Sequence, residues 1–155
     1  MNSILFVCLG NICRSPMAEA AMHIAADKHG LTLEIDSAGT GDWHIGQPPD
    51  PRAQAAALKL GNTDISKLQG RQITNRDFLE YDLICALDES NLADLRAMGG
   101  DGPAEISLLL DHLPGSEGQA VADPYYGNDG DFAMCWAQVT AATDALARRL
   151  SKTNW

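Results

Sequence analysis

Short apolar segments alternate with longer helical patterns along the chain, and this alternation limits the folds that it can adopt. Strands are predicted over residues 3–8, 33–35, 82–87 and 106–110, and the second is bounded by a loop over residues 36–41. Helices are predicted over residues 15–29, 51–60, 88–98 and 131–150, with Gly61 as the glycine cap of the second. Strands separated by helices pair in parallel, in a sheet that is covered on both faces. The sequence therefore predicts the α/β class, with a four-stranded parallel sheet flanked by helices on both faces.

The size and charge of the chain limit the kinds of partner that it can bind. A length of 155 residues suits one domain, residues 1–155. With 11 basic and 21 acidic residues the net charge is −10, which repels nucleic acid and anionic lipid, so a bound anion needs a local site. No apolar run approaches the roughly 20 residues that span a bilayer, and the N-terminus lacks the pattern of a secretory signal. We expect a cytoplasmic protein, a monomer with at most weak self-association, that binds neither nucleic acid nor membranes.

The cysteines and histidines carry no metal-binding pattern. The four cysteines include no CxxC pair, and reduced thiols are expected in a cytoplasmic protein. Cys85 and Cys135 lie within apolar patterns, which indicates that they belong to the core. The four histidines are scattered without the spacing of metal ligands. We therefore expect no metal and no other cofactor.

The loop after the first strand has the residues of an anion site. Ligands of parallel sheets bind beyond the carboxyl ends of the strands, and two such ends, at Cys8 and at Leu87-Asp88, carry polar residues. Cys8 ends the first strand and Arg14 precedes a helix, with five residues between them. The backbone N–H groups of such a loop form an anion-binding nest, and the planar fork of Arg14 can bind two phosphate oxygens. The predicted phosphate-binding residues are Leu9, Gly10, Asn11, Ile12, Cys13 and Arg14.

The same loop favours a reactive thiolate. The positive surroundings of Cys8 stabilise its ionised form, and the hydroxyl of Ser15 is placed to donate a hydrogen bond to it. A thiolate beneath a phosphate nest is a nucleophile for phosphorus, and no metal is needed where the amides and Arg14 offset the phosphate charge. The alternative is a buried structural cysteine beside an unrelated arginine.

The segment Val7–Pro16, VCLGNICRSP, resembles the signature loop of the low-molecular-weight protein tyrosine phosphatases. The resemblance extends over nearly the whole chain, through IGQPPD at 45–50, RQIT at 71–74, LDESNL at 87–92 and DPYYGN at 123–128. It implies a four-stranded parallel sheet flanked by helices. It also implies hydrolysis of phosphotyrosine in tyrosine-phosphorylated proteins, through a phosphocysteine on Cys8.

The resemblance also assigns residues that the sequence alone leaves open. Any of the 21 acidic residues could supply a proton, and the resemblance selects Asp123 as general acid for the first step and general base for the second. Trp43 and Tyr125 would form the aromatic walls of the pocket. Asn11 and Ser37 resemble the hydrogen-bonded pair that braces the loop. The full expected substrate pocket is Ile12, Trp43, His44, Tyr125 and Tyr126.

The chain departs from the family pattern at position 68, and the role of Cys13 has two interpretations. A histidine that is common in animal members, just before the RQIT segment, is Leu68 here, which puts part of the hydrogen-bond network around the loop in doubt. Cys13 has two interpretations: it fills space at the base of the loop, or, as in the family, it guards Cys8 against over-oxidation through a reversible disulfide.

Three other functions fit the loop less well. Protein arginine phosphatases of the same family carry threonine where this chain has Ile12, and an apolar residue there suits an aryl ring. Arsenate reductases of the same fold need two further thiols after the third strand; Cys85 could be the first, but Leu92 replaces the second. A non-catalytic phosphotyrosine-binding module would not need Cys8, Arg14 and Asp123 together.

Overall fold

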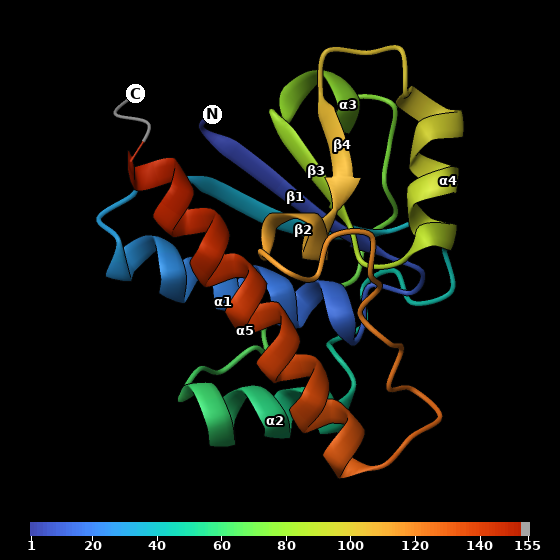
Figure 1. Cartoon of the computed structure of the whole chain (residues 1–155). Helices are drawn as coiled ribbons and strands as arrows, with labels where there is room; N and C mark the ends of the chain where they lie inside the picture. The colour runs from blue at the N-terminus through green and yellow to red at the C-terminus, as the bar shows by residue number, and fades with distance from the viewer. Residues whose placement is uncertain (153–155) are drawn as a thin grey trace.

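Four parallel strands form the centre of the molecule in a computed structural model that describes residues 1–152 (Figure 1). The strands are β1 (Ser3–Cys8), β2 (Glu34–Gly39), β3 (Leu83–Ala86) and β4 (Glu105–Leu108), and their order in the sheet is β2-β1-β3-β4. This confirms the predicted parallel sheet. Residues 153–155 of the predicted domain range lie outside the described part.

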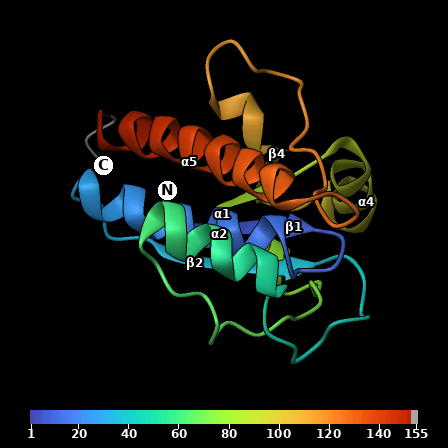
Figure 2. The same ribbon diagram turned by 90° about the horizontal axis from the view of Figure 1, so that it is seen from below.

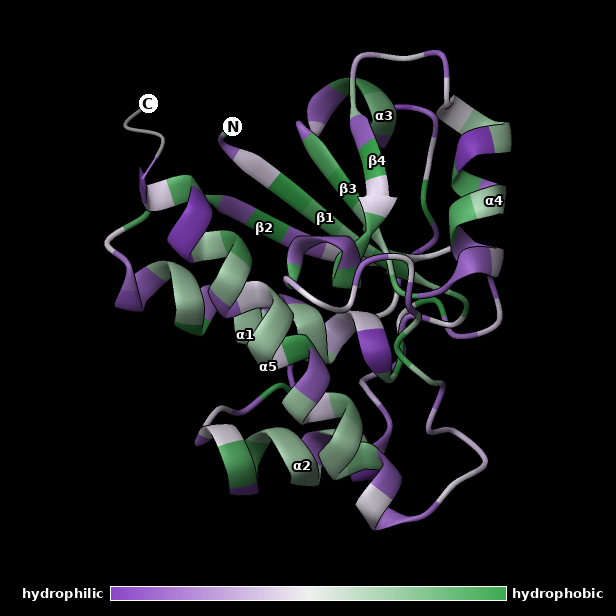
Figure 3. Ribbon diagram, in the orientation of Figure 1, coloured by the Kyte–Doolittle hydropathy of each residue, from purple (hydrophilic) through white to green (hydrophobic). Residues whose placement is uncertain are grey.

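Helices cover both faces of the sheet, as predicted (Figures 1 and 2). The helices are α1 (Arg14–Lys28), α2 (Pro51–Gly61), α3 (Asp77–Glu80), α4 (Glu89–Gly99), the 3₁₀ turn η1 (Leu109–His112) and α5 (Asp129–Lys152). Ile4 and Phe6 of β1 pack in the core on the side of α1, α2 and α5, whereas Leu5 and Val7 pack on the side of α3 and α4. This alternation follows from the two-residue period of a strand. The two central strands, β1 and β3, are accordingly among the most hydrophobic segments (Figure 3).

The end of α2 differs from the prediction. Asp50 caps the start of the helix by accepting a hydrogen bond from the backbone N–H of Arg52, as expected before Pro51. Gly61, however, is the last helical residue, and Asn62 is the left-handed cap, with φ of 49°. A Cβ on Gly61 would lie 2.2 Å from the ring of Trp136, so this glycine makes room for α5 instead of capping the helix.

Two strand boundaries and one helix were also predicted wrongly. β2 runs on through Asp36–Gly39, the start of the predicted loop, because these residues pair with β1. β4 ends at Leu108, and Leu109 and Leu110 belong to η1, where their side chains are still buried. The short helix α3 was not predicted. In the described part of the chain, no helix is long and apolar enough to cross a membrane.

The topology brings several chain segments to one edge of the sheet. Cys8 at the end of β1 pairs with Gly39 at the end of β2. Asp88 follows β3 at the same edge and caps α4 through the backbone N–H of Asn91. The residues that follow β1 and β2, together with the segment before α5, surround one pocket.

Candidate active site

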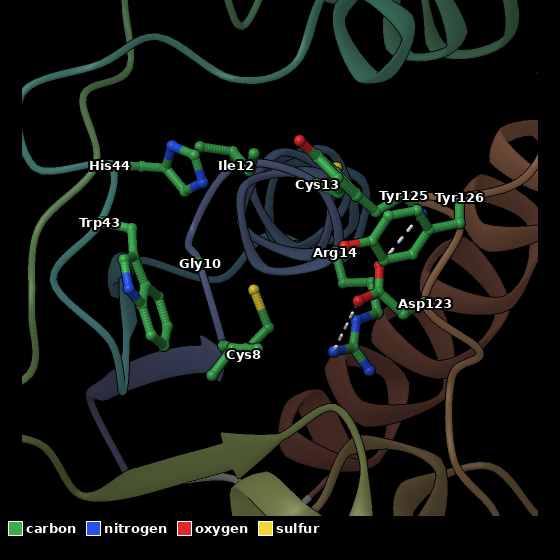
Figure 4. A pocket seen from close by; sticks show the side chains of 11 residues that line it. Cys8, Gly10, Ile12, Cys13, Arg14, Trp43, His44, Asp123, Tyr125 and Tyr126 are labelled. Carbon is green, nitrogen blue, oxygen red and sulfur yellow. Dashed lines mark hydrogen bonds and ion pairs between the residues drawn. The ribbon is translucent and has the colours of Figure 1, made fainter.

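The loop from Cys8 to Arg14 forms the floor of a pocket at this edge of the sheet (Figure 4). Both ends of the loop are buried: Cys8 and Arg14 are 3% exposed. The pocket volume of about 220 Å³ is smaller than that of a typical drug site, which limits it to a small group. The pocket is lined by Cys8, Leu9, Gly10, Ile12, Cys13, Arg14, Trp43, His44, Asp123, Tyr125 and Tyr126.

Three carbonyl groups of the loop accept hydrogen bonds from residues outside it. Those of Cys8 and Leu9 accept hydrogen bonds of 2.9 Å from the backbone N–H groups of Thr40 and Gly41, and that of Ile12 accepts one of 2.8 Å from Asp50. Within residues 1–152, none of the backbone N–H groups of residues 9–13 donates a hydrogen bond. The loop therefore offers a set of unpaired donors, which is the chemistry of an anion-binding nest.

Asn11 holds the loop in its curved shape. Its φ of 58° lies in the left-handed region, which asparagine tolerates better than most residues. Its side-chain Nδ2 donates to Ser15 Oγ at 2.8 Å and to Ser37 Oγ at 3.0 Å, and its Oδ1 accepts from the backbone N–H of Arg71. The predicted bracing pair is thus in hydrogen-bond contact.

The environment of the Cys8 thiol follows from this bracing. Cys8 Sγ lies 3.0 Å from Ser15 Oγ. Ser15 Oγ accepts a hydrogen bond from Asn11, so its own hydrogen can point at the sulfur or at the carbonyl oxygen of Ala38, which is farther away at 3.5 Å. The structure therefore provides a hydroxyl donor for a thiolate at Cys8.

Arg14 is fixed by two acceptors and faces a third group. Its Nη1 donates to Asp88 Oδ2 at 2.7 Å and to the carbonyl of Val121 at 3.0 Å, and its Nη2 lies 3.7 Å from Asp123 Oδ2. Burial by itself would lower the pKa of Arg14, but Cys8, Asp88 and Asp123 outweigh it and raise that pKa. The guanidinium stays charged in the buried floor of the pocket.

Two groups of side chains flank the thiol. Trp43 and His44 lie on one side of Cys8, and Tyr125, Tyr126 and Asp123 lie on the other (Figure 4). Trp43 is 64% exposed and Tyr125 38%, so both rings keep a face free for a ligand, whereas Tyr126 at 96% points mostly to solvent. Asp123 Oδ1 accepts a hydrogen bond from the backbone N–H of Tyr125 at 3.1 Å.

The remaining cysteines are buried. Cys85 and Cys135 lie in the core, as predicted, and burial raises the pKa of the Cys135 thiol to about 12. Cys13 borders the pocket, and burial, followed by the charge of Asp50, strongly raises the pKa of its thiol. All four thiols are free. Within residues 1–152, no three histidine, cysteine or acidic side chains gather as metal ligands would.

The network around the loop is complete without a histidine at position 68. Ser37 donates a hydrogen bond of 2.7 Å to the buried carboxylate of Glu19, whose other oxygen lies 3.8 Å from His23 Nε2. Leu68 instead packs at the edge of the core. Asn11, Ser37 and Glu19 are thus linked by hydrogen bonds in a chain that has leucine at position 68.

Sequence reasoning missed three charged residues around the pocket: Glu19, Arg52 and Asp88. Asp88 lies at a strand end that the sequence marked as functional, so its position was a usable signal. Glu19 is a buried charge on an otherwise small and apolar helix face, a pattern that indicates a specific partner. Arg52 gives no such signal, because its contacts with residues 125 and 127 depend on the folded chain.

Comparison with known proteins agrees with this geometry. Residues 3–154 match the family described as low molecular weight phosphotyrosine protein phosphatase. The low molecular weight protein-tyrosine-phosphatase YfkJ of Bacillus subtilis is 44% identical over 155 residues, covering 98% of this chain and 97% of the relative. A protein tyrosine phosphatase structure from Entamoeba histolytica is similar with a TM-score of 0.90 and 32% identity over 100% of both chains. The Drosophila arginine phosphatase structure has a TM-score of 0.88 and 32% identity, covering 97% of this chain and 98% of that one. The chain therefore belongs to the low molecular weight phosphotyrosine protein phosphatase family, a family of hydrolases.

Proposed function

We propose that this chain is a protein tyrosine phosphatase that hydrolyses phosphotyrosine through a phosphocysteine on Cys8. The observation that carries the proposal is the arrangement of three groups around one pocket. The Cys8 thiol lies at its floor, the Arg14 guanidinium lies beside it, and the carboxyl group of Asp123, which is protonated for the first step, lies 3.7 Å from that guanidinium. These are a nucleophile, a charge that binds phosphate and a proton donor.

In the first step, Cys8 Sγ attacks phosphorus. The S–P bond forms, the bond from phosphorus to the tyrosine oxygen breaks, and Asp123 gives its proton to the departing phenolate. A phenol has a pKa near 10, so this proton transfer removes a poor leaving group. The N–H groups of the loop and Arg14 stabilise the charge on the equatorial oxygens, so the step requires no metal.

In the second step, water attacks the phosphocysteine and Asp123, now a carboxylate, takes a proton from that water. The S–P bond breaks, inorganic phosphate is released and the Cys8 thiolate is restored. The hydrogen bond available from Ser15 stabilises this thiolate as a leaving group.

The pocket favours an aryl substrate. Trp43, Tyr125 and Ile12 offer apolar surface around the path to Cys8, which suits the flat ring of phosphotyrosine. Phosphoarginine is the second candidate, because the Drosophila arginine phosphatase is also similar to this chain. Its extended guanidinium group gains less from an apolar Ile12.

For Cys13 we propose the role of redox guard. A peroxide would oxidise Cys8 to the sulfenic acid, and the thiol of Cys13 would displace water from it to form a disulfide that thiol reductants reverse.

The proposal is tested by phosphate release from a phosphotyrosine peptide and a phosphoarginine peptide in parallel, in the presence of a metal chelator. Release from phosphotyrosine that is lost in Cys8→Ser supports the proposed function. Preference for phosphoarginine would change the proposed substrate but leave the proposed role of Cys8 as nucleophile unchanged. Release from neither peptide would overturn the proposal, and arsenate would be the next ligand to test.

A further inference from the structure

Arg52, in the first turn of α2, connects two parts of the site that are far apart in the sequence. Its Nε and Nη2 bond to the two carboxylate oxygens of Asp50, at 3.1 and 2.9 Å. Its Nη2 also donates to the carbonyl of Tyr125 at 2.9 Å, and its Nη1 to the carbonyl of Gly127 at 3.3 Å. One guanidinium thus holds the start of α2 and the segment that carries Asp123.

Asp50 extends this connection to the phosphate-binding loop. Its backbone N–H donates a hydrogen bond of 2.8 Å to the carbonyl of Ile12. Its carboxylate stays ionised, because the hydrogen bond from the Arg52 side chain lowers the pKa of Asp50 although burial opposes this. The path from Ile12 through Asp50 and Arg52 to Tyr125 therefore consists of short hydrogen bonds.

The segment 122–127, here called the acid loop, follows Val121, which is buried and fixed by a backbone hydrogen bond to Leu87 and by one from Arg14. The acid loop itself has few other attachments. Within residues 1–152, its hydrogen bonds to other elements come from Arg52 alone, and the ion pair of Asp123 with Arg14 is longer, at 3.7 Å. The other two bonds, from Tyr125 to Asp123 and from Gly127 to Pro124, are internal. The start of α5 lies beside α2 on the same side of the molecule (Figures 1 and 2), so Arg52 spans the junction between them.

The plane of the Arg52 guanidinium is itself held by two rings. Its central carbon lies 4.5 Å from the ring centroid of Phe132, which is buried, and 5.7 Å from that of Tyr125. Contacts of this kind between a cation and a ring favour one orientation of the guanidinium. Lysine at this position would lack the planar fork that stacks on a ring while it bonds to both carboxylate oxygens.

We propose that Arg52 is a positioning residue that holds the acid loop where Asp123 can reach the leaving oxygen of the substrate. The inference rests on the proposed function, in which Asp123 is the general acid. A proton donor acts only within hydrogen-bond reach of the reacting oxygen, and a misplacement of about 1 Å can cost about 10²-fold in rate. Releasing the acid loop therefore impairs proton donation more than phosphate binding.

The test compares Arg52→Met and Arg52→Lys with the unmodified chain on two substrates, phenyl phosphate and p-nitrophenyl phosphate. Phenolate needs a proton to leave, whereas p-nitrophenolate leaves readily without one. We measure kcat/KM, because it reports the steps up to loss of the phenol. Methionine keeps the apolar stem beside Phe132 and removes every hydrogen bond.

We expect Arg52→Met to lower kcat/KM about 10- to 10²-fold for phenyl phosphate and less than about threefold for p-nitrophenyl phosphate. Arg52→Lys should show a smaller loss with the same preference. Inhibition by inorganic phosphate should stay unchanged, because the phosphate-binding loop is intact. The matched control is Arg76→Met, which removes an exposed arginine whose partner is Glu80 on α3, and it should change neither rate.

A double variant distinguishes an effect of Arg52 that acts through Asp123 from one that does not. In an Asp123→Asn background, Arg52→Met should cause no further loss that depends on the leaving group. An equal loss on both substrates, no loss, or a selective loss that persists without Asp123 would each overturn the inference. If Asp123→Asn itself shows no dependence on the leaving group, the assignment of the general acid fails instead. Should Arg52→Met unfold, the same comparison with Arg52→Lys decides.

Discussion

Arg14 donates a hydrogen bond to Asp88 across 2.7 Å, and this pair orients the guanidinium independently of any substrate. Asp88 also caps α4, so it joins the end of β3 to Arg14, the residue proposed to bind phosphate. A preoriented guanidinium loses little side-chain freedom when it binds phosphate.

We predict that Asp88→Asn lowers kcat/KM for phosphotyrosine about fivefold, because a charge-assisted hydrogen bond exceeds a neutral one by roughly 1 kcal/mol. Asparagine caps helices as well as aspartate does, so the unfolding temperature should change little. The loss of one negative charge near the pocket would by itself strengthen phosphate binding. Unchanged or tighter phosphate inhibition would therefore mean that Asp88 does not orient Arg14.

Cys8→Ser should reduce phosphate release by more than about 10³-fold, because a serine hydroxyl without an adjacent base is a weak nucleophile. The phosphate-binding N–H groups and Arg14 remain. Calorimetry should therefore still detect inorganic phosphate binding to this variant. Residual activity equal to that of a distant surface variant would refute the role of Cys8.

Asp123→Asn should lower kcat/KM for the hydrolysis of phenyl phosphate by roughly 10²–10⁴-fold. The decrease for p-nitrophenyl phosphate should be far smaller. The reason is that only the poorer leaving group depends on a proton. The measurement is a series of aryl phosphates with phenols of graded acidity. A uniform slowdown along the series would point to another acid.

Gly39→Ala should disturb the phosphate-binding loop. A Cβ at Gly39 would lie 2.7 Å from the carbonyl oxygen of Leu9 and 3.2 Å from the backbone nitrogen of Asn11. Both are backbone atoms that cannot rotate away, so we expect phosphate affinity to fall at least about 10-fold. Gly102→Ala, where a Cβ meets nothing closer than 3.3 Å, is the control. Equal phosphate inhibition of the two variants would contradict the prediction.

Acidification should destabilise the fold through His112. Its Nδ1 accepts a hydrogen bond from Arg149 Nη2, and its Nε2 lies 2.9 Å from Ser107 Oγ. Burial first, and then the charge of Arg149, lower the pKa of His112 in the folded chain, although Glu105 and Asp111 oppose this.

The sign follows from the number of protons that each state binds. An unfolded histidine has a pKa near 6.5, so below that pH the unfolded chain takes up a proton that the folded chain resists. The stability that His112 contributes is therefore complete above about pH 6.5 and lost as the pH falls towards the folded pKa. Unfolding in denaturant at pH 7 and pH 5 should show a smaller difference in His112→Gln than in the unmodified chain. An equal difference would rule out this role.

The parts of the site that sequence could predict are those carried by neighbouring residues. Cys8, Arg14 and Ser15 lie in one short segment between a strand and a helix, so their shared loop follows from local pattern. Asp123 required the resemblance, because nothing local distinguishes it among 21 acidic residues. Arg52 and Asp88 act on residues more than 70 positions away, and no local pattern encodes such contacts.

The errors in the fold have similar causes. Asp36–Gly39 have the composition of a turn, yet they form a strand because Ser37 and Ala38 are buried beside β1 and Ser37 bonds to Glu19. Leu109 and Leu110 look like the continuation of β4, since apolar side chains serve a strand and a buried 3₁₀ turn equally well. Tertiary contacts decided both cases.

The pocket takes residues from the end of β1, the segment after β2 and the acid loop, which is more than 100 residues from Cys8. A partly folded chain could bring together one or two of these segments, but not all three. Turnover should therefore return during refolding only with the last docking event. The recovery of activity would then report only the completion of folding. Earlier collapse and helix formation would not contribute to it.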